Sequence, residues 1–169
     1  MTNRPYPYYP AYNGGKETPG IRKFVDLMAR RYGCTSLGTY VVRNMRNNSQ
    51  PPQLSVHATG AAADVQYKDE KQARAIWDWL LGSSIIDGKT VEHSERLGLV
   101  ELHWYAYGDY GAGYRCSRGE GKAGVKIYTA TENAGSYTGS PRWFHAELSK
   151  EMAADAAKFE AAWRSLPKP

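Results

Sequence analysis

Residues 98–107 have the sequence GLVELHWYAY, in which apolar side chains occupy every second position. This alternation is typical of a β-strand, because successive side chains of a strand point to opposite faces of the sheet. The segment therefore predicts a strand with a carboxylate and an imidazole on the same face. That face would carry Leu99, Glu101, His103 and Tyr105, and the other would carry Val100, Leu102, Trp104 and Ala106.

Three other segments have the spacing of apolar residues that an amphipathic helix requires. The first two are residues 20–32 and residues 69–81, and each is followed by a glycine that can end a helix. Acidic residues in the first turn of the second segment suit the helix dipole. The third is a closing helix over residues 149–166, with Ser149 as its N-cap. Its apolar stripe consists of Met152, Ala156, Phe159 and Trp163.

Further short strands are expected between and after the helices. They are residues 39–42 (TYVV), 125–130 (VKIYTA) and 142–148 (RWFHAEL). This order of elements favours an α+β fold with a small antiparallel sheet flanked by helices. Residues 1–19 are rich in proline and tyrosine, and we expect an irregular N-terminal arm that its tyrosines hold onto a single domain over residues 20–169.

The composition restricts the class of protein. The chain has 169 residues, 41% of them hydrophobic, and a net charge of +5. No apolar run is long enough to cross a bilayer, and the N-terminus lacks the apolar segment of a secretory signal. We expect synthesis in the cytoplasm, no membrane partner, and a preference for polyanions. Cys34 and Cys116 are far apart in the sequence, which favours buried or idle thiols over the alternative of a disulfide between them.

The segment of residues 55–64, SVHATGAAAD, carries a candidate metal site. His57 and Asp64 are seven positions apart, with Gly60 and small residues between them. A histidine at the start of a loop and an aspartate on the following strand can reach the same ion, and the glycine permits the turn. Catalytic zinc sites use three protein ligands, with nitrogen and carboxylate oxygen among the donors. His145, in the strand expected late in the chain, is the candidate for the third ligand.

The same segment fits the pattern SxHxxGxAxD, which resembles that of the zinc D-alanyl-D-alanine carboxypeptidases and L-alanyl-D-glutamate endopeptidases of bacteria and phages. The third ligand of that family lies in a late W-H-x-E stretch, and residues 143–147, WFHAE, are similar with one additional residue. The order of the other segments is similar to that of small actinobacteriophage peptidases. The resemblance covers about residues 20–150. It implies a Hedgehog-like zinc peptidase fold in which His57, Asp64 and His145 bind Zn²⁺.

The sequence departs from the family at two positions. Ala61 follows the motif glycine where the family often has arginine, and Arg142 stands where the family has its general base, three residues before the late histidine. An arginine remains protonated and cannot act as a base at neutral pH. Glu101, on the same strand face as His103, is the first candidate to replace the acid. Glu147 is the second, with the alternative role of orienting a metal ligand.

The resemblance implies hydrolysis of an amide bond in the stem peptide of bacterial peptidoglycan, with zinc activating a water and a carboxylate transferring its proton. Arg142 or Arg118 would bind a substrate carboxylate, since a guanidinium contacts both oxygens. His103 would orient the substrate or stabilise an oxyanion, or would only hydrogen-bond within the sheet. The glycine-rich residues 108–140 would form a wall of the substrate cleft or a surface loop. His93 is expected in a solvent-exposed loop or at a helix start.

Two other hypotheses come from different features. The arginine in place of the acid motivates a catalytically inactive, wall-binding or virion structural module on the same fold. The net charge and the tyrosine and arginine content motivate a nucleic-acid-binding domain, but no motif of such a domain is present, so we expect no nucleic-acid partner. We expect a monomer that acts at the cell wall, either after release through a membrane lesion made by another phage protein or as part of a virion.

Overall fold

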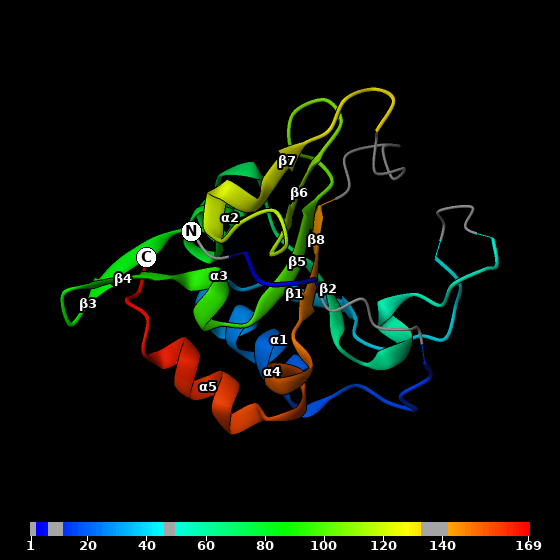
Figure 1. Ribbon diagram of the computed structural model, residues 1–169, viewed down its shortest axis with the longest axis horizontal. Helices are drawn as coiled ribbons and strands as arrows, with labels where there is room; N and C mark the ends of the chain where they lie inside the picture. The colour runs from blue at the N-terminus through cyan, green and yellow to red at the C-terminus, as the bar shows by residue number, and fades with distance from the viewer. Residues whose placement is uncertain (1–2, 7–11, 46–49, 133–141) are drawn as a thin grey trace.

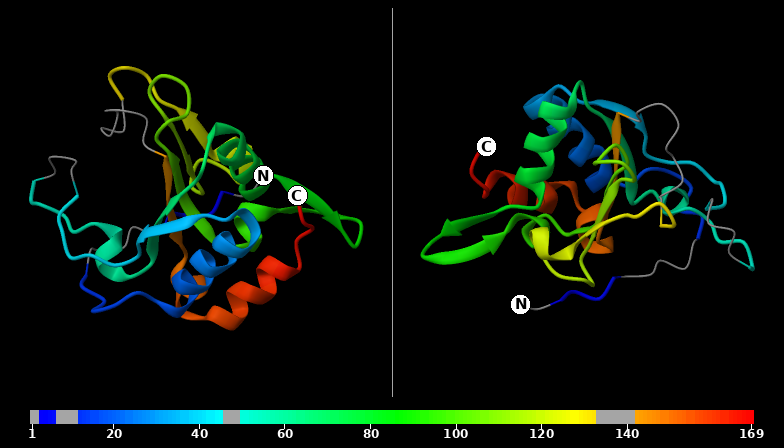
Figure 2. Two further views of the ribbon diagram at one scale, coloured as in Figure 1. Left: turned by 180° about the vertical axis from the view of Figure 1, so that it is seen from behind. Right: turned by 90° about the horizontal axis from the view of Figure 1, so that it is seen from above.

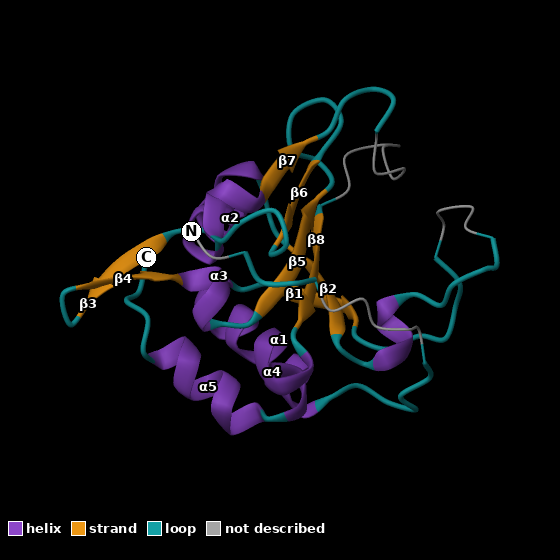
Figure 3. Cartoon of the chain, in the orientation of Figure 1, coloured by secondary structure: helices purple, strands orange, loops and turns teal. Residues whose placement is uncertain are grey.

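The computed structural model describes residues 3–6, 12–45, 50–132 and 142–169. Its centre is an antiparallel sheet of six strands flanked by helices, which confirms the expected α+β class (Figures 1 and 3). Across the sheet the strands follow in the order β1 (Thr35–Gly38), β2 (Ala62–Gln66), β8 (Trp143–Leu148), β5 (Leu99–Trp104), β6 (Ala112–Arg115) and β7 (Val125–Ile127).

The last strand of the chain lies in the interior of this sheet. β8 pairs with β2 on one side and with β5 on the other, and both pairings are antiparallel. The strand that follows the SxHxxGxAxD motif and the strand predicted over residues 98–107 are therefore both neighbours of β8. Side chains from three distant segments of the chain share one face as a result.

One face of the three central strands is apolar and is covered by helices. Trp77 of α2 (Glu70–Leu80) stacks on Phe144 of β8, with ring centroids 6.3 Å apart. Figure 2 shows α1 (Pro19–Tyr32), α2 and α5 (Ala156–Arg164) on this side of the sheet, and the 3₁₀-helix η1 (Val56–Thr59) on the other. The buried side chains of this face include Val65, Leu102, Trp104, Phe144 and Ala146.

The first two predicted helices are confirmed. α1 ends where Gly33 adopts a left-handed conformation with φ of 70°, as the glycine signal indicated. α2 begins after Asp69, whose carboxylate accepts a hydrogen bond from the amide of Gln72 and so caps the helix.

The closing helix predicted over residues 149–166 is instead two helices, α4 (Lys150–Ala154) and α5. Asp155 separates them, because its backbone is extended and its carboxylate accepts a hydrogen bond from the amide of Lys158 at the start of α5. Ser149 caps α4 as predicted. Phe159 of the predicted apolar stripe packs edge to face on Phe24 of α1, with centroids 6.0 Å apart.

Two of the other strand predictions are confirmed and one is wrong. Residues 142–148 contain β8, and residues 125–130 begin with β7. Residues 39–42 contain no strand. The strand in this region is β1, because Gly33 turns the chain so that Thr35 pairs with Gln66 of β2 and the pairing stops at Gly38. The glycine-rich stretch also holds β6 and the 3₁₀-helix η2 (Gly121–Gly124), which were not predicted.

A two-stranded hairpin, β3 (Ser83–Ile86) and β4 (Lys89–Glu92), was also not predicted. Its turn is Asp87-Gly88, and both residues have positive φ, which is the turn chemistry that two-residue hairpins favour.

His93 begins α3 (His93–Arg96), which agrees with the helix-start alternative, but it is not exposed to solvent. Its side chain is buried, with Nδ1 2.6 Å from the carbonyl oxygen of Trp79 and Nε2 2.7 Å from the hydroxyl of Ser84. Ser84 belongs to the β3–β4 hairpin, so the hairpin contributes to the burial of the ring. The local sequence around His93 does not predict this contact.

The described part of the N-terminal arm, residues 3–6 and 12–18, contains no helix or strand. No helix in the described parts of the chain has the length and apolar character that crossing a bilayer needs. Cys34 and Cys116 are buried free thiols, which agrees with the first expectation and not with a disulfide.

Candidate metal centre

The SxHxxGxAxD motif forms a short 3₁₀-helix, a tight turn and a strand. The hydroxyl of Ser55 accepts a hydrogen bond from the amide of His57 at the start of η1. Gly60 ends η1 with φ of 77°, and a Cβ atom at this position would lie 2.2 Å from the carbonyl oxygen of Lys16. Only glycine fits there, both for its backbone and for the close approach of the arm. The turn directs the chain into β2, on which Asp64 lies.

The register of the central strands brings the chemistry-bearing residues together in two rows. Asp64 of β2 pairs with His145 of β8, and His145 pairs with His103 of β5. In the adjacent row, Glu147 of β8 pairs with Glu101 of β5. Side chains two positions apart on a strand point to the same face, so both rows lie on the face opposite to the apolar one.

His57, Asp64 and His145 can hold a metal ion together. The atoms that converge are His57 Nε2, His145 Nδ1 and Asp64 Oδ1. The distance between the two nitrogens is 3.2 Å, and the Asp64 oxygen lies 2.9 Å from His145 and 3.3 Å from His57. Donor atoms at the corners of a tetrahedron around zinc are about 3.3–3.4 Å apart, since the bonds are about 2.0–2.1 Å long. The donor set and its spacing therefore fit the ion.

The surroundings of these three residues favour a positive charge. Burial opposes ionisation of Asp64, but hydrogen bonds from His145 and His57 hold the pKa of its carboxyl well below the ordinary range. Burial likewise lowers the pKa of His145, but hydrogen bonds to Asp64 and Glu147 raise it to about 10 in the metal-free protein. In the metal-free protein His145 therefore holds a proton at the place where a bound metal ion would supply the positive charge. The side chain of His57 is buried, whereas that of Asp64 is 26% exposed, so the site opens toward solvent on the Asp64 side.

Glu147 is fully engaged in hydrogen bonds. Its Oε1 lies 3.0 Å from His145 Nε2, and its Oε2 accepts a hydrogen bond of 2.6 Å from the hydroxyl of Tyr6. A carboxylate only accepts hydrogen bonds, so the proton of the neutral His145 ring stays on Nε2 and leaves Nδ1 free to bind a metal. This arrangement fits the orienting role that was the alternative for Glu147.

Glu101 is also held at both oxygens. Oε1 contacts Nε2 of His103, and Oε2 accepts a hydrogen bond of 2.7 Å from Nε of Arg115. Burial opposes ionisation, but His103 and then Arg115 lower the pKa of Glu101 to about 2. The other ring nitrogen of His103, Nδ1, lies 3.2 Å from the hydroxyl of Tyr128. Glu101 therefore keeps the proton on Nε2, and Nδ1 remains as an acceptor.

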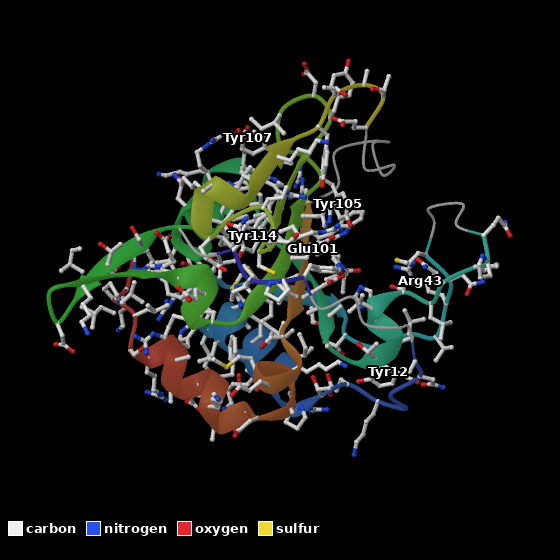
Figure 4. All side chains as sticks on the ribbon, in the orientation of Figure 1. Tyr12, Arg43, Glu101, Tyr105, Tyr107 and Tyr114 are labelled. Atoms are coloured by element: carbon white, nitrogen blue, oxygen red, sulfur yellow. The ribbon has the colours of Figure 1, made fainter. Side chains whose placement is uncertain are left out.

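The ring of His103 stands beside the candidate metal centre. Its centroid is 6.2 Å from that of His145, and it lies nearly parallel to the rings of Tyr105 and Tyr128, at centroid distances of 5.7 and 6.0 Å. Gly113 makes room for this arrangement, because a Cβ atom there would lie 2.1 Å from the Tyr128 hydroxyl. Glu101 lies on β5, and Tyr105 follows the last residue of that strand (Figure 4).

The two candidate substrate-binding arginines are placed differently. Arg142 is exposed just before β8, and it lines a cavity of about 340 Å³ together with Tyr67 and Trp104. Trp104 belongs to the apolar face of the sheet, so this cavity is not lined by the metal-binding residues. Arg118 donates hydrogen bonds to the carbonyl oxygens of Gly124 and Gly113, and so holds the glycine-rich segment in place. Neither arginine contacts the three candidate ligands.

Sequence reasoning did not single out Tyr6, Arg115 or Tyr128. The one signal for Tyr6 was the general expectation that the tyrosines of the N-terminal arm hold the arm onto the domain. Arg115 is the last residue of β6, and Tyr128 follows β7. The sequence of the glycine-rich stretch has no alternation of apolar residues that would assign either side chain to a face of the sheet. Only the pairing of β6 with β5 places Arg115 opposite Glu101.

The donor atoms of the motif of residues 55–64 and of the late histidine converge as described. Ala61 is buried at the turn, and its carbonyl oxygen accepts a hydrogen bond of 3.0 Å from the amide of Leu148.

In comparisons with known proteins, the chain matches no family model, no curated protein and no solved structure.

Proposed function

We propose that this protein is a zinc-dependent peptidase that hydrolyses an amide bond in the stem peptide of bacterial peptidoglycan, on a Hedgehog-like domain. One observation carries the proposal. The converging nitrogens of His57 and His145 and the oxygen of Asp64 lie beside a histidine, His103, that a buried carboxylate orients. A three-ligand centre next to an acid–base group is the arrangement that metal-assisted hydrolysis needs.

His57, Asp64 and His145 would hold the zinc ion. When bound, zinc lowers the pKa of a water to about 7 and polarises the scissile carbonyl group. Glu147 orients His145 through Nε2, so that the nitrogen facing the centre is the unprotonated one. An ordered partner of this kind is a regular feature of metal-binding histidines.

His103 performs the proton transfer. Its Nδ1 accepts a proton from the attacking water and returns it to the nitrogen of the leaving amine, and Glu101 stabilises the imidazolium that forms. The hydroxyl of Tyr128 lies 3.2 Å from Nδ1, so it is placed to relay this proton to and from the ring. In this proposal Glu101 acts through His103, because its Oε1 pairs with Nε2 of that ring and its Oε2 is held by Arg115.

The substrate is negatively charged, since stem peptides carry carboxylates, and the net charge of +5 favours association with an anionic wall. Of the two candidate arginines, Arg118 is engaged with backbone carbonyl oxygens and Arg142 is exposed, so we propose that Arg142 binds a substrate carboxylate away from the metal centre. We propose that the protein acts as a monomer at the wall, as a released lysis enzyme or as part of a virion.

The test is digestion of purified muropeptides from several wall types by the zinc-loaded protein, with the products identified by mass spectrometry. The proposal expects one new free amine and one new carboxylate at a single stem-peptide bond, and no products with the chelated protein. Binding of zinc and of cell walls with no cleavage of any wall type would contradict it, and would favour the inactive wall-binding module instead.

A further inference from the structure

Two residues of the N-terminal arm reach into the domain. Arg4 pairs with the buried carboxylate of Glu120, with its Nη2 3.1 Å from Oε2. The same nitrogen donates hydrogen bonds to the carbonyl oxygens of Leu99, at 2.6 Å, and Ser94, at 3.3 Å. In Figure 1 residues 3–6, in dark blue, pass across β5 toward β8. Arg4 therefore fixes the arm at the start of β5.

Two positions further along, Tyr6 reaches the candidate metal centre. Its hydroxyl donates a hydrogen bond of 2.6 Å to Glu147 Oε2, and Glu147 Oε1 lies 3.0 Å from His145 Nε2. The opposite nitrogen of that ring lies 2.9 Å from Asp64. A continuous chain of hydrogen bonds thus joins the arm to the ligand atom of His145.

Tyr6 also touches the group that holds Glu101. The guanidinium carbon of Arg115 lies 4.5 Å from the centroid of the Tyr6 ring, and Arg115 binds Glu101. Burial and the charge of Glu147 raise the pKa of Tyr6 far above its ordinary value, so the hydroxyl remains a donor at any working pH. One side chain therefore contacts Glu147 itself and the arginine that binds Glu101.

We propose that Tyr6 is a positioning residue for the metal centre: its hydroxyl fixes the Glu147 carboxylate, which in turn orients the ligand His145, and Arg4 holds the arm that presents it. This inference rests on the proposed metal-binding function. It assigns to the arm a part in assembling the centre, although the arm lies outside the motif that carries the ligands.

The physical basis is the freedom of the Glu147 carboxylate. With Oε2 unpartnered, the side chain is free to rotate away from His145, and the ring loses the contact that fixes its orientation and its protonated nitrogen. Loss of such an outer partner costs about 10–100-fold in metal affinity when the partner touches the ligand directly. Tyr6 is one contact further away, and we expect the lower end of that range, about 10-fold.

The decisive variant is Tyr6→Phe, which removes the hydroxyl and keeps the ring that covers Arg115. Tyr12→Phe is the matched control, since Tyr12 belongs to the same arm and is 48% exposed (Figure 4). Zinc affinity is measured by competition with a chelator, and the Co²⁺-substituted proteins are compared by visible absorption. Thermal unfolding of the metal-free forms shows whether each variant folds.

We expect Tyr6→Phe to bind zinc about 10-fold more weakly than wild type and to have a shifted Co²⁺ spectrum, because the ligand geometry changes. Tyr12→Phe should match wild type in both. Equal zinc affinity and an equal spectrum for Tyr6→Phe and wild type would overturn the inference. Wild-type protein that binds no zinc would instead overturn the proposed function, so the two failures are distinguishable.

Arg4→Lys tests the second part of the proposal, since lysine keeps the charge and loses the geometry that reaches the two backbone carbonyls. If Arg4 acts through Tyr6, the loss of zinc affinity in Arg4→Lys combined with Tyr6→Phe will be smaller than the sum of the two single losses. Strictly additive losses would contradict the role of Arg4 as the holder of Tyr6.

Discussion

Asp64 and His145 are directly paired residues of β2 and β8, and Asp64 Oδ1 lies 2.9 Å from His145 Nδ1. The pairing brings together two residues that are 81 positions apart in the chain. With His57 Nε2 at 3.2 Å from the same nitrogen, it forms a set of donors suited to a divalent cation.

Metal content will depend on His57 and His145. Wild-type protein should carry about one zinc ion per chain, and His57→Ala and His145→Ala should each lose it, because two donors hold zinc far more weakly than three. Elemental analysis after dialysis against trace zinc measures this directly. His103→Asn is the control and should retain the metal, since His103 is not among the converging donors. Metal retained in both alanine variants would exclude this site.

Proton transfer will depend on His103. His103→Asn should lower the rate of muropeptide hydrolysis by about 10²-fold or more with zinc content unchanged, which is the scale of general acid–base catalysis. Glu101→Gln should also lower the rate, because the glutamine cannot stabilise the imidazolium. The two rates are compared at saturating substrate. Full activity of His103→Asn beside an inactive Glu101→Gln would instead identify the carboxylate as the base.

The stability of the metal-free protein will depend on pH through Glu101. Its folded-state pKa of about 2 lies below the ordinary value of 4.5, so the ionised carboxylate stabilises the fold above about pH 4.5. That contribution is lost as the pH falls from 4.5 toward 2. At 1.36 kcal/mol per pKa unit, the upper limit is about 3 kcal/mol.

Urea unfolding of wild type and Glu101→Gln, each at several pH values in the presence of a chelator, measures this effect. The difference between their free energies of unfolding should shrink as the pH is lowered through this window. A difference that stays constant from pH 5 to pH 2.5 would be inconsistent with a carboxylate held ionised by His103 and Arg115.

Replacement of Gly60 will damage both the fold and the metal centre. Gly60→Ala combines a left-handed backbone with a Cβ atom that would lie 2.2 Å from a carbonyl oxygen. Gly15→Ala is a matched control, because Gly15 has φ of 79° but no atom within 4 Å of a built Cβ.

The control should lose about 1–2 kcal/mol, the backbone cost alone. Gly60→Ala should lose at least about 2 kcal/mol more, since buried backbone must move to relieve the contact. Thermal and denaturant unfolding measure both variants, and equal losses would show that the contact with the arm is relieved without cost.

The two cysteines will be unreactive in the folded protein. Burial raises the pKa of the Cys34 thiol to about 11, and Cys116 is fully buried, so little thiolate is available to a reagent at pH 8. Labelling with a thiol reagent under native conditions should therefore be slow for both. After unfolding without a reductant, two thiols per chain should react, and a count of zero would indicate a disulfide.

The sequence by itself determined the local elements and the candidate ligands. The apolar spacing of residues 20–32 and 69–81 predicts α1 and α2, and the SxHxxGxAxD motif with the late histidine identifies His57, Asp64 and His145. These features are local, because helical periodicity, caps and the conformation of a glycine turn depend on residues a few positions apart. The same reasoning failed at residues 39–42, where the position of β2 as a partner decides which residues form the edge strand.

Only the tertiary structure decided which partners each glutamate has. From the sequence, Glu101 was the first candidate for the base and Glu147 the second, since each lies on a strand face beside a histidine. The strand order β2-β8-β5 with β6 beyond it gives Glu147 to His145 and Tyr6, and gives Glu101 to His103 and Arg115. Hydrogen-bond partners across a sheet come from segments whose separation in the chain carries no information about register, so only folding assigns them.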